Sequence, residues 1–81
     1  MEDAQVVHRI NEIAEEEERL WARAEEEGGL SPEEQARLSE LKVHLDQFYD
    51  LLAQRRARRS AGLNPDEATV RPAEIVERYQ Q

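Results

Sequence analysis

The stretch Gln35–Arg59, QARLSELKVHLDQFYDLLAQRRARR, carries the strongest structural signal in this chain. Its apolar residues recur at steps of three and four, which keeps them on one face of an α-helix. They are Leu38, Leu41, Leu45, Phe48 and Leu52. No proline or glycine interrupts residues 33–61, so the pattern predicts a long helix over about 32–61 with an apolar seam along one side.

A second long helix is predicted upstream, over about 3–27, with Asp3 as its N-cap. Its own three–four seam consists of Val6, Ile10, Ile13, Glu17, Leu20 and Ala24. Gly28-Gly29 ends this helix, because glycine accepts the left-handed backbone of a helix C-terminus. Ser31–Glu34 then supplies an N-cap serine, a first-turn proline and a capping box for the next helix. So short a connection places the two helices antiparallel.

The two seams match when the numbers of facing residues sum to about 58, as expected for an antiparallel pair. The facing pairs are Val6–Leu52, Ile10–Phe48, Ile13–Leu45, Glu17–Leu41 and Leu20–Leu38. Glu17 is the acidic exception. Its carboxylate either reaches out of the seam towards Lys42 or His44, or serves as a buried polar group that specifies register.

The segment after the second helix repeats the pattern of the interhelical turn, since GLNPDE at 62–67 parallels GLSPEE at 29–34. This predicts one helical turn from Pro65. Pro72 limits its length, because a proline disfavours helix at the residue before it. An extended Val70-Arg71 should follow.

A short helix is then expected from about Pro72 to Tyr79. Its apolar face would carry Ile75, Val76 and Tyr79. We therefore divide the chain into a helical hairpin over 1–62 and a C-terminal turn and short helix over 63–81 that packs on the hairpin.

The long helices carry more apolar surface than one seam buries. Val7, Ala14 and Trp21 form a second row on the first helix, and Tyr49 flanks the seam of the second. The sequence thus predicts an all-α fold in which two hairpins pair through these four residues as a homodimeric four-helix bundle. The competing prediction is a monomer in which the tail folds across the hairpin as a third helix.

Charge is unevenly distributed over the 81 residues, whose formal net charge is −8. Residues 1–34 contain twelve acidic and three basic residues, whereas 35–64 contain three acidic and six basic ones. The average charge disfavours nucleic acid as a partner, but the local basic cluster does not. The absence of cysteine excludes disulfides and thiolate metal sites. No segment is apolar enough for a membrane span and no signal peptide is recognised, so we expect a cytoplasmic protein.

The basic cluster lies at the end of the second helix and includes one residue of the tail. Its members are Arg55, Arg56, Arg58, Arg59 and Arg71. One interpretation is structural, because cations complement the helix dipole and can hold Asp66 and Glu67. A second is an arginine-rich end that engages an acidic protein partner. A third is contact with nucleic-acid phosphates.

We expect a small helical interaction or structural protein, with a nucleic-acid- or ribosome-associated factor as the alternative. His8 and Glu12 are four residues apart, as are Glu40 and His44, but neither pair matches the Glu-x-x-His spacing of di-iron bundles. No phosphate-binding glycine loop or nucleophile motif occurs. We therefore expect no catalytic residue, no cofactor and no metal site.

The C-terminal half contains several specific segments: Leu51-Leu52, Gln54–Arg58 (QRRAR), Gly62, Pro65–Ala68 (PDEA), Val70–Pro72 (VRP) and the Val76-Glu77 and Tyr79 of the VExY tail. In these segments the chain resembles a small bacterial family of about eighty residues, known as a domain of unknown function. Leu45–Gln47 and the acid-rich first helix also fit. The resemblance covers nearly the whole chain and implies a soluble bacterial protein, without an activity or a substrate.

Overall fold

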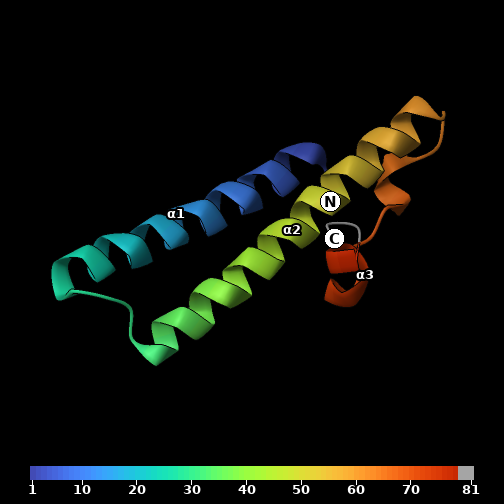
Figure 1. Cartoon of the computed structure of the whole chain (residues 1–81). Coiled ribbons are helices and arrows are strands. Elements are labelled where there is room, and N and C mark those ends of the chain that lie inside the picture. Colours follow the sequence, from blue (N-terminus) through green and yellow to red (C-terminus); the bar gives the residue numbers. More distant parts are fainter. Residues whose placement is uncertain (79–81) are drawn as a thin grey trace.

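Two long antiparallel helices dominate the computed structural model, which describes residues 1–78 (Figure 1). Helix α1 spans Asp3–Glu27 and helix α2 spans Pro32–Ser60. A 3₁₀ turn, η1, follows at Pro65–Glu67, and a short helix, α3, spans Ala73–Arg78. The tail turns back after α2, so that η1 and α3 both lie against α2. Residues 1–78 are therefore all-helical, as the sequence predicts, with two long helices and a short third one.

The start of α1 differs from the prediction in its capping residue. Glu2, not Asp3, is the N-cap, and its backbone N–H donates to Gln5 Oε1 at 2.8 Å. Asp3 is the first helical residue. The physical reason is that the Asp3 carboxylate accepts hydrogen bonds from two arginines of α2 and is not used to cap its own helix.

The interhelical turn follows the predicted chemistry. Gly28 adopts a left-handed φ of 81°, and its N–H donates to the Ala24 carbonyl. Ser31 and Glu34 form the reciprocal capping box at the start of α2, with N–H to side-chain distances of 2.9 and 3.1 Å. The local sequence thus satisfies the free backbone groups at both ends of the turn.

The seam between α1 and α2 forms the core. The buried hydrophobic residues are Val6, Ile10, Ile13, Ala24, Leu41, Leu51, Leu52 and Val76. The main cluster joins Val6 and Ile10 to Leu51 and Leu52, with Leu45, Phe48 and Ala68 packed around it. Leu51 belongs to this cluster although it lies beside the seam.

Glu17 occupies its seam position half-buried. Within residues 1–78 it forms no ion pair, with Lys42, His44 or any other residue. The polar position in the seam is therefore not compensated by an opposite charge.

The tail packs through fewer residues than predicted. Val76 is buried, whereas Ile75 is 40% exposed, so the expected apolar face includes only one of these two neighbours. The reason is geometric, since successive helical residues point about 100° apart and α3 contacts only α2. Tyr79, the third predicted member, lies outside the described residues.

Candidate functional site

Arg55 connects three parts of the chain at the open end of the hairpin. It occupies the next seam position after Phe48 and Leu52, and its side chain is only 3% exposed. Its Nε donates to Asp3 Oδ1 at 2.6 Å, and its Nη1 donates to Asp66 Oδ1 at 2.9 Å and to the Pro65 carbonyl at 3.1 Å. The guanidinium therefore joins α1, α2 and η1, and each of these contacts is charge-assisted.

Two neighbouring arginines extend this arrangement. Arg59 Nη2 lies 3.0 Å from the second carboxylate oxygen of Asp3. Arg58 Nη2 lies 2.6 Å from Glu67 Oε2, and its Nε donates to the Asn64 carbonyl at 2.8 Å. The end of α2 thus holds the start of α1 on one side and η1 on the other.

Arg71 holds the tail further along α2. Its Nε donates to Asp50 Oδ2 at 2.8 Å, and its Nη2 contacts the other oxygen of the same carboxylate. Gln47 and Gln54 donate to the carbonyls of Arg71 and Thr69, at 3.1 and 3.0 Å. Sequence reasoning missed these contacts. The signal was present, because Gln47, Asp50 and Gln54 recur at steps of three and four and form a polar row on α2.

We name Arg55, Arg58, Arg59 and Arg71 the arginine clamp. Hydrogen bonds from Arg55 and then Arg59 lower the pKa of Asp3, and the hydrogen bond from Arg71 lowers the pKa of Asp50. The hydrogen bond to Asp3 likewise raises the pKa of Arg55. These groups stay ionised around neutral pH and neutralise one another inside the chain.

Arg56 is the one predicted cluster member outside the clamp. Its side chain is exposed, and it forms no ion pair with any other residue in the described range 1–78. It lies seven residues after Tyr49, on the same stripe of α2. The structure therefore separates Arg56 from the four arginines that contact carboxylates.

The predicted dimer face forms one flank of the hairpin, which we name the open flank: Val7, Ala14, Trp21 and Tyr49. Each of these residues directly follows a seam residue, which places all four on the same side of an antiparallel pair. Val7, Trp21 and Tyr49 are 42%, 52% and 54% exposed, and Ala14 is half-buried.

The opposite side of the hairpin, which we name the closed flank, carries Arg9, Glu16, Arg37 and Leu51. Arg37 forms a two-point ion pair across the hairpin with Glu16, with nitrogen–oxygen distances of 2.6 and 2.9 Å. This contact lowers the pKa of Glu16. Arg9 stacks over Phe48, 5.9 Å from the ring centroid. Leu51, on the same side of α2, is buried. The closed flank and the tail thus leave the open flank as the uncovered apolar side of the hairpin.

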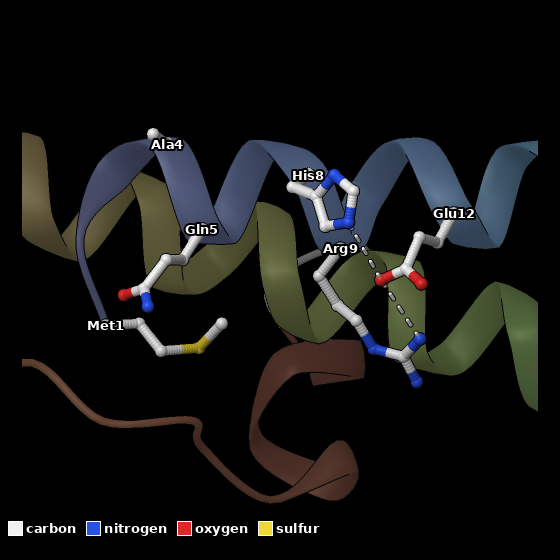
Figure 2. Close-up of a pocket in the computed structure, with 6 residues that line it drawn as sticks. All are labelled: Met1, Ala4, Gln5, His8, Arg9 and Glu12. Carbon is white, nitrogen blue, oxygen red and sulfur yellow. Dashed lines mark ion pairs between the residues drawn. The ribbon is translucent and has the colours of Figure 1, made fainter.

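A shallow hollow lies at the start of α1, on the side of the helix that also carries Arg9. It has a volume of about 400 Å³ and is lined by Met1, Ala4, Gln5, His8, Arg9 and Glu12. Figure 2 shows Glu12 between His8 and Arg9, with a nitrogen of each 3.7 Å from Oε1 of Glu12. All six residues belong to the first turns of the chain, and His8 and Glu12 are exposed there.

Residues 1–78 contain no cluster of three or more histidine, cysteine or acidic side chains arranged to hold a metal ion. Neither α1, α2 nor α3 offers a segment both long and apolar enough to cross a lipid bilayer.

These features define an all-helical hairpin whose tail is fastened by an arginine clamp. The chain belongs to a family described as a protein of unknown function (DUF2630), whose model matches residues 2–81. It is also 43% identical over 77 residues to uncharacterised proteins of Mycobacterium bovis and of two strains of Mycobacterium tuberculosis, covering 95% of this chain and 88% of each relative. No solved structure matches. The resemblance to a small bacterial family is thereby confirmed.

Proposed function

We propose that this protein is a non-catalytic helical interaction module whose working unit is a homodimer formed through the open flank. The observation that carries the proposal is the exposure of Val7, Trp21 and Tyr49 on one side of the hairpin. Large apolar side chains gathered on one face of a small soluble domain are typical of an interaction surface. Pairing two hairpins through this face makes a four-helix bundle and adds to the small core of a short chain.

The arginine clamp supports an internal role for most of the basic cluster. Arg55, Arg58, Arg59 and Arg71 each contact a carboxylate of the same chain. An acidic partner or a nucleic acid would have to compete with these intramolecular pairs. We therefore place the interaction surface on the open flank, and we do not extend the proposal to nucleic acid.

The fluorescence of Trp21, the one tryptophan of the chain, tests the proposal directly. In a dimer its ring loses water contact, so emission should shift to shorter wavelength as the concentration rises. Trp21→Glu should abolish this association, with a molar mass by light scattering near the monomer's 9.4 kDa.

Ile75→Glu is the matched control, because Ile75 is also an exposed apolar residue but lies on α3. This variant should keep the dimer mass. A dimer mass retained by Trp21→Glu, or an equal loss of dimer in both variants, would show that the open flank is not the dimer interface.

A further inference from the structure

We infer that the two copies associate antiparallel, with Ala14 on the two-fold axis and the acidic turn of each hairpin beside the open end of the other. This inference rests on the proposed homodimer and specifies its geometry. The occupant of the open flank is thus a second copy of this chain.

The spacing of the α1 row is self-complementary. Val7 and Trp21 each lie seven residues, or about 10 Å along the helix, from Ala14. A two-fold axis through Ala14 brings α1 against α1 of the second copy. Val7 then faces Trp21 of the other copy twice, which is the reciprocal contact required of a two-fold interface. The small alanine at the centre lets the two helices approach closely.

The alternative two-fold axis runs parallel to the helices. It would place α1 of one copy against α2 of the other, so that Val7 would face Tyr49. Both turns would then lie at the same end of the dimer. The two arrangements therefore differ in which charged parts of the hairpins meet.

The charge distribution decides between them. The half of the hairpin that contains the turn, residues 15–43, has ten acidic and four basic residues, whereas residues 1–14 and 44–62 together have five of each. The tail docked on the open half, residues 63–78, adds four acidic and two basic residues there. The parallel arrangement therefore joins two strongly acidic halves, and the antiparallel one joins each of them to a half with much less net charge. Like charges at one end of an interface disfavour association, which leaves the antiparallel dimer.

Arg56 fits the same geometry. It is exposed, it lies on the stripe of Tyr49, and no carboxylate of residues 1–78 pairs with it. In the antiparallel dimer it faces the start of α2 in the second copy, beside the turn, where Glu33 is exposed. The open flank thus combines an apolar row on α1 with a cation near one end and acidic residues near the other.

Cysteine cross-linking tests the arrangement, since the chain has no native cysteine. Ala14→Cys alone should form an interchain disulfide in a glutathione redox buffer, because the two copies of residue 14 meet at the axis. Val7→Cys alone should not, because its two copies lie about 21 Å apart, beyond the roughly 7 Å reach of a disulfide.

A mixture of Val7→Cys and Tyr49→Cys chains reports the parallel arrangement, because these residues meet there and lie about 20 Å apart in the antiparallel dimer. A mixed disulfide in this sample, with or without one in Ala14→Cys, would overturn the antiparallel geometry. A dimer mass without the Ala14→Cys disulfide would overturn it too. A monomer mass in every sample would instead contradict the proposed homodimer itself.

Charge reversal gives a second readout. Arg56→Glu should weaken dimerisation at low salt by about twofold to thirtyfold, because each dimer contains two such exposed contacts. Arg19→Glu makes the same charge change at another exposed site, on the outer face of α1, and should leave the affinity within about twofold. Equal effects of both substitutions would contradict the placement of Arg56.

Discussion

At the residue scale, Arg55 is the most consequential side chain of the fold. It continues an apolar seam with a cation, which is stable there because two carboxylates and a backbone carbonyl accept its hydrogen bonds. A buried guanidinium left without such acceptors would be strongly destabilising. The residue numbers of Asp3 and Arg55 sum to 58, as they do for the facing apolar pairs. This ion pair therefore forms the last layer of the seam.

Arg55→Ala should lower the urea midpoint of unfolding by about 1 M or more, because it removes a buried hydrogen-bonded group that joins three segments. Arg55→Lys should recover little, since an ammonium cannot reproduce the forked donor geometry. Arg19→Ala is the control, an exposed arginine without an ion pair in the described range, and it should have almost no effect. Equal midpoints for the Arg55 and Arg19 variants would show that the clamp does not stabilise the fold.

Acid should destabilise the protein through Asp3 and Asp50. Both carboxyl groups have a lowered pKa in the folded chain, because arginines donate to them. Their contribution is therefore fully present above the ordinary aspartate pKa of about 4, and it is lost as the pH falls through the lower folded pKa values.

Urea midpoints measured from pH 6 down to about pH 2 check this dependence. The double variant Asp3→Asn, Asp50→Asn should be less stable at pH 6 and should lose less stability over the same range. An identical pH slope for the variant and the natural chain would contradict the role of these two carboxyls.

At the element scale, the local sequence signals predicted the helices well but the tail less completely. The glycine, serine, proline and acidic residues of the two turns specify where α1 ends and where α2 and η1 begin. These signals are local, so they can be interpreted without tertiary contacts. The docking of the tail depends on Gln47, Asp50 and Gln54, which accept or donate to residues about 15 to 24 positions away. Apart from their position on one face of α2, nothing in the local sequence around these three residues indicates that they contact the tail.

The capping of α1 and the orientation of Ile75 illustrate the same limit. Asp3 is a good capping residue, but the tertiary contact with Arg55 outweighs that local preference. Ile75 and Val76 are equally apolar, and only the position of α2 selects Val76 for burial. Sequence patterns thus located the basic cluster, and the fold determined which of its members pair with carboxylates.

Glu17 offers a test of the seam itself. It is half-buried at a position facing Leu41, and it has no ion pair with another residue of 1–78. Glu17→Leu should therefore stabilise the protein by about 1–2 kcal/mol, by burying apolar surface between α1 and α2.

Urea denaturation measures the change, with Glu15→Leu as the control because Glu15 is exposed away from the seam. Glu15→Leu should change the free energy of unfolding by less than about 0.5 kcal/mol. A lower midpoint for Glu17→Leu would show that the glutamate has a specific role in the register of the hairpin.

At the scale of the whole molecule, the two flanks of the hairpin have different roles. The closed flank and the clamp complete the fold of one chain through ion pairs and the docked tail. The open flank leaves Trp21 and Tyr49 about half exposed, at 52% and 54%. Ion pairs within the chain engage most charged groups at the open end of the hairpin, while the turn stays strongly acidic. In the proposed dimer, folding and association use different surfaces, and the open flank joins the two copies.

Sedimentation equilibrium of the unmodified chain at micromolar concentration tests that claim most directly. We predict a molar mass near twice the chain's 9.4 kDa, decreasing towards the mass of one chain on dilution. A mass that stays at 9.4 kDa across the concentration range would contradict it. The protein would then be a monomeric hairpin whose tail alone completes the core.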